Sequence, residues 1–139
     1  FLCVLQRVLS LNNNFFQNRM ISHMSLPVSD LEKSKAFYVE ALKPLGYAVV
    51  MEFPGFVGLG VNGDPDFWLV PGKNPEGLHI AFGAENRALV GAFYEAAMAA
   101  GAKDNGGPGL RPHYGENYYG AFVFDLDGHN IEAVCHHPE

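Results

Sequence analysis

The sequence predicts an α+β fold built from two tandem βαβββ modules, and an internal repeat is the main reason. Ala36-Phe37-Tyr38 recurs as Ala92-Phe93-Tyr94, an offset of 92 − 36 = 56. At the same offset His23 falls on His79 (79 − 23 = 56). Both copies also read as the same order of strand-like and helix-like segments, which indicates a duplicated supersecondary unit. We therefore expect a curved mixed sheet around a cavity, with the helices on its outer face.

The first module is expected over residues 20–72. Residues 21–28 form a strand, because Met24 and Leu26 alternate with polar neighbours. Ser29 is the expected N-cap of the following helix, with Glu32 completing a capping box. That helix is expected to end at Pro44 and Gly46. Three strands follow, separated by Gly/Pro-containing turns, over Tyr47–Phe53, Phe56–Val61 and Asp66–Val70.

The second module is expected over residues 76–137. It starts with a strand over Leu78–Phe82 and continues with a helix over Asn86–Ala100, closed by Gly101. The Gly/Pro-rich stretch Lys103–Glu116 reads as a loop, with one edge strand within it as an alternative. The last two strands are Tyr118–Phe124 and Asn130–His136, joined by a turn at Asp127-Gly128.

Both modules fit into one domain, residues 20–139, because two separate cores would each be too small to be stable. Residues 1–19 differ from the rest in having Arg7 and Arg19 but no acidic residue. They are either a mitochondrial transit peptide or an N-terminal extension, disordered or not native, ahead of a start at Met20. We favour the extension, and with it a cytoplasmic location.

Composition excludes several classes of function. Nine Lys and Arg stand against fifteen Asp and Glu, for a formal charge of −6. This balance argues against binding to nucleic acid and to anionic membrane surfaces. Only Cys3 and Cys135 occur, which is unlike a disulfide-rich secreted domain, and we expect Cys135 to be a buried, inert thiol. No apolar run is long enough to span a membrane.

Strand alternation sorts the side chains onto two faces. The apolar positions, such as Leu26 and Ile80, are expected to face the helices. The opposite face then carries His23, Ser25, Phe56, Gly58, Gly60, Trp68, His79, Ala81 and Glu132. Because several of these residues are small, this face is expected to leave space for a ligand.

The same face suggests a metal site. The turns that end the modules match at an offset of 125 − 61 = 64, which aligns Trp68 with Glu132 (132 − 68 = 64). His23, His79 and Glu132 therefore occupy repeat-equivalent positions and form a two-histidine, one-carboxylate set. That set is typical of mononuclear Fe²⁺ oxygenases and also suits Mn²⁺, Ni²⁺ or Zn²⁺. Taken singly, each residue is as well explained by a core histidine or an ion-paired glutamate.

Further candidates lie in and after the long loop. His113 and Tyr118 are candidate acid–base residues, and Arg111 and Tyr114 are candidate substrate contacts together with Ser25, Phe56 and Trp68. The alternatives are an exposed loop for His113 and sheet packing for Tyr118. His129 is expected in a turn. The Gly106-Gly107-Pro108-Gly109 run lacks the strand–helix context of a dinucleotide site.

Three stretches resemble the vicinal oxygen chelate superfamily: ISHMSLPVSDLEKSKAFYVEAL, GLHIAFGA and AFVFDLDGHNIEAVCH. This superfamily includes glyoxalase I, extradiol dioxygenases, fosfomycin thiol transferases and bleomycin-resistance proteins. The resemblance covers Met20 to His137, and its most specific element is the ending Asp-x-Asp-Gly-x-x-x-Glu. It implies paired βαβββ modules around a divalent metal held by His23, His79 and Glu132, within one chain or across a homodimer. Trp68 stands where glyoxalase I has a further ligand.

The resemblance thus implies a metal-dependent enzyme acting on a small oxygen-rich molecule, a glyoxalase-like lyase or isomerase or a dioxygenase (an oxidoreductase). The alternative is a metal-free protein that binds or sequesters a small molecule, as bleomycin-resistance proteins do. The content of tightly bound metal discriminates between the two.

Overall fold

The computed structural model describes residues 22–73 and 76–139, so the expectations for residues 1–19 lie outside it. The first module contains β1 (Met24–Val28), α2 (Leu31–Leu42), the short 3-10 helix η2 (Lys43–Leu45), β2 (Ala48–Phe53), β3 (Phe56–Val61) and β4 (Asp64–Pro71). The second contains β5 (His79–Gly83), α3 (Arg87–Ala99), β6 (Lys103–Asp104), β7 (Gly109–Leu110), β8 (Tyr119–Phe124) and β9 (Asn130–Cys135). The predicted order of elements is confirmed, and the predicted loop holds two short strands, β6 and β7.

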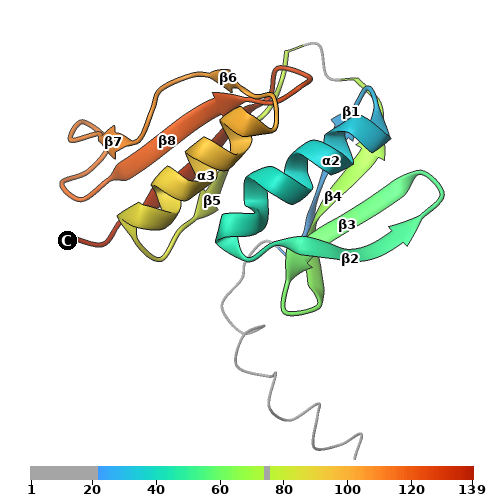
Figure 1. Cartoon of the computed structure of the whole chain (residues 1–139), viewed down its shortest axis with the longest axis horizontal. Coiled ribbons are helices and arrows are strands. Elements are labelled where there is room, and N and C mark those ends of the chain that lie inside the picture. The colour runs from blue at the N-terminus through green and yellow to red at the C-terminus, as the bar shows by residue number, and fades with distance from the viewer. Residues whose placement is uncertain (1–21, 74–75) are drawn as a thin grey trace, which may run out of the picture.

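Each module forms its own sheet. The strand order is β1-β4-β3-β2 in the first and β5-β9-β8-β6 in the second, where β7 also pairs with β8. The first strand of each module runs parallel to the last, and the other pairs are antiparallel, so both sheets are mixed. β1 and β5 are edge strands, and the sheets lie side by side with both helices in front of them (Figure 1).

Helix α2 begins one residue later than predicted. Its N-cap is Asp30, whose carboxylate accepts a hydrogen bond from the backbone N–H of Lys33 at 3.1 Å. The N–H of Ser29, the predicted cap, instead donates to the carboxylate of Asp127 at 3.1 and 3.2 Å. Both residue types cap helices well, so only this tertiary contact decides between them.

Neither described α-helix is long and apolar enough to cross a membrane.

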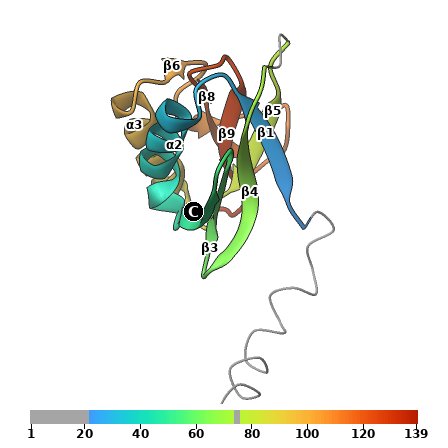
Figure 2. The ribbon, with the colours of Figure 1, turned by 90° about the vertical axis from the view of Figure 1, so that its right-hand side faces the viewer.

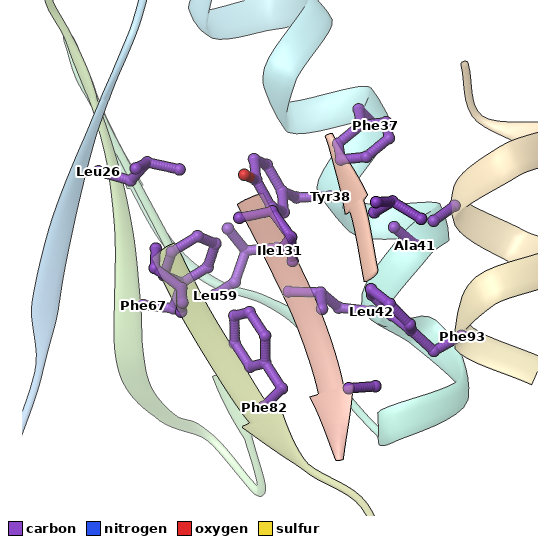
Figure 3. Packing of buried hydrophobic residues seen from close by; sticks show 14 of the residues in the cluster. Leu26, Phe37, Tyr38, Ala41, Leu42, Leu59, Phe67, Phe82, Phe93 and Ile131 are labelled. Carbon is purple, nitrogen blue, oxygen red and sulfur yellow. The ribbon is translucent and has the colours of Figure 1, made fainter. Parts of the chain in front are cut away.

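One core serves both modules. Phe67 of β4 and Phe82 of β5 meet edge to face with their ring centroids 5.3 Å apart, and Tyr38 of α2 packs on Phe67 at 5.0 Å. Figure 3 shows these side chains converging between the two sheets and the helices. Cys135 lies in the same cluster with 1% of its surface exposed, as expected. Because both apolar faces point into this core, the opposite faces are turned outward; Figure 2 shows the helices and sheets on opposite sides.

The turn between β8 and β9 fastens the second module to the first. The buried Asp125 carboxylate accepts the Tyr38 hydroxyl of α2 at 2.6 Å and the N–H groups of Asp127 and His129. Burial, followed by the Asp125 charge, raises the pKa of Tyr38 well above its ordinary value. We call Asp125, Asp127 and His129 the module latch, since Asp127 binds Ser29 of the first module.

His129 is the histidine of the latch. It is fully buried, whereas the sequence places it only in a turn. Its Nδ1 accepts the N–H of Leu78 at 3.0 Å, so its Nε2 carries the proton and donates to the carbonyl of Pro27 at 3.0 Å. The imidazole therefore connects the entry to β5 with β1 across the module boundary.

Replacing this imidazole should cost substantial stability. His129→Ala leaves the Leu78 N–H and the Pro27 carbonyl without partners and opens a cavity, so the free energy of unfolding should fall by about 2–4 kcal/mol. Urea denaturation measures the change. His113→Ala, in the exposed loop, is the matched control and should stay within about 0.5 kcal/mol of the parent chain. Equal stability of the two variants would show that His129 does not hold the modules together.

Candidate functional site

His79 and Glu132 meet on the outward face of the second sheet. β5 and β9 are parallel neighbours, with Ala81 directly opposite Glu132. His79 Nδ1 lies 3.1 Å from the carbonyl of Asn130, so Nδ1 carries a proton and donates to it. His79 Nε2 points at Glu132 Oε2, 3.3 Å away. The histidine side chain is 53% exposed and the glutamate side chain only 1%.

This orientation has a chemical consequence. With its proton on Nδ1, a neutral imidazole turns the lone pair of Nε2 toward a carboxylate oxygen, and two such acceptors repel each other unless a cation lies between them. The cation can be a proton on Nε2 or a metal ion. Imidazole nitrogen and carboxylate oxygen suit the divalent metals considered above, and the Asn130 carbonyl orients the ring as it does in many metal sites. The donor set therefore fits a metal.

Tyr118 completes the surroundings of Glu132. Its hydroxyl donates a short hydrogen bond to Oε1, leaving Oε2 for His79. Partial burial, and then Glu132, raise the pKa of Tyr118 to about 12, so the phenol stays protonated at neutral pH. Both carboxylate oxygens thus have defined neighbours, and the one buried carboxylate of this face is held in a single orientation.

A row of rings extends from Tyr118 into the loop. The Tyr114 ring lies 5.2 Å from the Tyr118 ring, and the His113 ring lies 4.1 Å from that of Tyr114. The His136 ring, near the C-terminus, meets the Tyr118 ring edge to face at 5.1 Å. The structure therefore brings the predicted residues His113, Tyr114 and Tyr118 into one row, of which Tyr118 contacts Glu132. Tyr114 remains 62% exposed, which suits a residue at the mouth of a site.

Arg111, the other loop candidate, lies on the same face. Its guanidinium carbon is 5.6 Å from the centre of the Phe122 ring, and that ring is stacked on His79 at 6.4 Å. Phe122 pairs with Glu132 in the β8–β9 ladder. Sequence reasoning missed Phe122, although its alternation with the buried Ala121 and Val123 places it on the outward face.

The remaining candidates belong to the first sheet. Ser25 lies opposite Trp68 in the β1–β4 register, as Ala81 lies opposite Glu132, which confirms that Trp68 and Glu132 are structural equivalents. His23 precedes β1, is exposed, and lies 2.8 Å from the hydroxyl of Ser22 through its Nδ1. Within residues 22–73 and 76–139, no three His, Cys, Asp or Glu side chains come together to hold a metal. One chain thus joins His79 to Glu132 and leaves His23 apart.

The small residues of β3 have structural causes that the sequence did not reveal. A Cβ on Gly58 would lie 2.9 Å from the Trp68 ring, and one on Gly60 would lie 1.9 Å from the Asp64 carbonyl oxygen. These glycines accommodate Trp68 and the backbone, rather than leaving ligand space. Phe56, the other candidate of this strand, is 51% exposed at its start.

A groove of about 540 Å³ lies instead at the junction of the modules. It is lined by the start of β1, the end of β5 and the segments beside them, among them His23, Tyr47, Asp66, Phe82 and Glu85. His79 and Glu132 do not line it.

Comparisons with known proteins agree with this architecture. The family model of the Glyoxalase/Bleomycin resistance protein/Dioxygenase superfamily matches residues 20–133. No curated protein matches the sequence closely enough to count as a relative. A glyoxalase/bleomycin resistance protein from Albidiferax ferrireducens superposes with a TM-score of 0.73 at 27% identity, covering 86% of this chain and 100% of that one.

Two further solved structures share the fold at lower identity. A glyoxalase-related enzyme from Fulvimarina pelagi has a TM-score of 0.65 at 22% identity, with 84% of this chain and 88% of that one covered. The fosfomycin resistance protein FosX from Listeria monocytogenes, solved as a mutant with Mn(II) and 1S,2S-dihydroxypropylphosphonic acid, has a TM-score of 0.63 at 20% identity, with 81% and 86% covered. The repeated βαβββ modules and the family match together show that this chain belongs to the Glyoxalase/Bleomycin resistance protein/Dioxygenase superfamily.

Proposed function

We propose that the protein is a metal-dependent enzyme acting on a small oxygen-rich molecule. The observation that carries the proposal is the orientation of His79, whose Nδ1 is engaged by a carbonyl while Nε2 faces the buried carboxylate of Glu132. His79 and Glu132 would hold Fe²⁺, Mn²⁺, Ni²⁺ or Zn²⁺, and such an ion supplies Lewis-acid stabilisation of negative charge on substrate oxygens. Tyr118 keeps Glu132 in position.

We further propose that a second copy of the chain supplies His23 and that the enzyme is a homodimer. The shared core turns the outward face of each sheet away from the other module, and β1 and β5 are edge strands that a second chain can approach. The β2–β3 hairpin also exposes apolar side chains, with Met51 at 45%, Phe53 at 56% and Phe56 at 51%. Such a patch is typical of an interface. Two-fold symmetry would create two equivalent sites per dimer.

A metal-free binding protein is the second candidate. A proton on Nε2 would turn His79 into an imidazolium that pairs with Glu132 without any metal. Trp68, which cannot coordinate a metal, occupies the position equivalent to Glu132 in the first module. The outward face would then capture a ligand without transforming it.

Metal content separates the two candidates. The parent chain, purified without a His tag or chelators, should contain about one divalent metal per chain by elemental analysis. Glu132→Ala removes the only buried acidic donor of this face and should abolish metal binding, and Glu132→Gln should do the same while preserving the shape of the side chain.

The control for this experiment is Glu40→Ala, which removes an exposed carboxylate from α2 and should keep the metal. Far-UV circular dichroism should show all variants folded. Unchanged metal content in both Glu132 variants would eliminate Glu132 as a ligand. A parent chain that stays metal-free after reconstitution would favour the binding protein.

The hydroxyl of Tyr118 should matter for metal affinity even though it is not a ligand. Tyr118→Phe removes the hydrogen bond to Glu132 Oε1, so the carboxylate loses its fixed orientation, and the metal dissociation constant should rise about 10- to 100-fold. Competition with a chromogenic chelator measures this constant. Tyr119→Phe removes a hydroxyl from the adjacent residue and should leave it unchanged. An equal effect of both substitutions would show that Tyr118 does not orient Glu132.

A further inference from the structure

Arg111 has an unusual environment for a charged residue beside a candidate active site. One guanidinium nitrogen donates to the carbonyl of Gly107 at 2.8 Å and another to the carbonyl of Leu110 at 3.3 Å. The guanidinium carbon lies over the Phe122 ring, 5.6 Å from the ring centre. These contacts fix the position of the head group without neutralising its charge.

No carboxylate pairs with this guanidinium in residues 22–73 and 76–139. The Lys and Arg ion pairs found there have Lys33, Lys35 and Arg87 as their cations. A guanidinium offers more N–H donors than the two carbonyls accept, so Arg111 keeps donors for a further acceptor. Arginine presents these donors as a planar fork that matches carboxylate and phosphate groups.

The glycine-rich run that precedes Arg111 explains how the side chain is held. Gly109 belongs to β7, and a Cβ built on it would lie 2.8 Å from Arg111 Nη1. Any larger residue would therefore displace the guanidinium. We call Gly106–Gly109 the cradle of Arg111. Holding this side chain is a structural reason for a glycine-rich run that lacks the strand–helix context of a dinucleotide site.

Phe122 connects this cradle to the proposed metal site. Its ring contacts both groups: the His79 imidazole is stacked on it with an interplanar angle of 22°, and the Arg111 guanidinium lies over it. A substrate that reaches both groups would meet a metal ion at one end and hydrogen-bond donors at the other. A small diacid has an oxygen-bearing group at each end and therefore suits both contacts.

We propose that Arg111 binds a carboxylate of the substrate, and that the substrate is a small hydroxy acid or oxo acid with a second carboxylate. This inference rests on the proposed function, since it names the substrate class of the same site. The metal would take the oxygens at one end of the molecule, and Arg111 the carboxylate at the other.

Matched probes test this assignment. L-malate and 2-hydroxyglutarate carry the distal carboxylate, while L-lactate has the same 2-hydroxycarboxylate end without it. Isothermal titration of the Mn²⁺-loaded protein should show tighter binding of at least one diacid than of lactate. Arg111→Gln should raise the dissociation constant of that diacid about 10- to 100-fold and leave that of lactate unchanged. Arg111→Lys should recover only part of the loss, because an ammonium cannot form the bidentate pair.

Lys103→Gln is the control, since it removes the same charge from an exposed position on β6 of the same sheet. It should not change diacid binding. Equal affinity for lactate and both diacids in the parent chain, or an equal loss in the Lys103 and Arg111 variants, would overturn the role of Arg111.

The metal content of Arg111→Gln is measured separately and should equal that of the parent chain. A parent chain without metal would refute the proposed metal site and leave the role of Arg111 testable by malate titration of the metal-free parent and Arg111→Gln. A difference between them would support the anion site, and no difference would refute it.

Discussion

The shared core of the two modules is the constraint on which the rest of the structure depends. Phe67 and Phe82 bring the apolar faces of both sheets together, and the module latch fixes the relation of the second module to α2 and β1. A pair of sheets that share one core must turn their other faces outward. His79 and Glu132 lie on the outward face of the second sheet, whereas His23 lines the groove at the module junction, so the way the core is built separates them within one chain.

The outward faces have diverged although the modules are duplicates. The second sheet carries a buried carboxylate, an oriented imidazole and a fixed guanidinium, all on one surface. The first sheet has Trp68 where the second has Glu132, and its hairpin is apolar and exposed. One module thus provides most of the polar chemistry, and the other offers a histidine and an apolar surface. This division of roles is compatible with the proposed site shared between two copies.

Much of the fold was predictable because the internal repeat and the alternation of apolar and polar residues can both be read directly from the sequence. The offsets of 56 and 64 correctly identified Ser25 and Ala81, and likewise Trp68 and Glu132, as equivalent positions of the two modules. Ser25 lies opposite Trp68 in the first sheet, as Ala81 lies opposite Glu132 in the second. The contact between His79 and Glu132 followed from placing both on one face. The ligand role of His23 stays a prediction, because strand periodicity contains no information on how two modules pack together.

The missed features depend on contacts between distant residues. Asp30 and Ser29 are equally good caps, and only the pairing of Ser29 with Asp127 selects Asp30. His129 looked like a turn residue because its two partners, Leu78 and Pro27, lie far away in the sequence. The glycines of β3 looked like unfilled space because the Trp68 ring that covers Gly58 comes from the next strand. The cradle of Arg111 could not be predicted, because it depends on the conformation of the loop that contains Gly107 and Gly109.

Subunit complementation tests most directly whether the metal site is shared between two copies. His23→Ala and Glu132→Ala chains, each alone, should bind no metal. After the two are unfolded together and refolded as an equal mixture, half of the dimers should contain one chain of each kind and therefore one intact site. The account predicts that the mixture recovers about a quarter of the metal bound by the parent protein. A mixture that binds no metal, or a His23→Ala chain that keeps its metal, would contradict it.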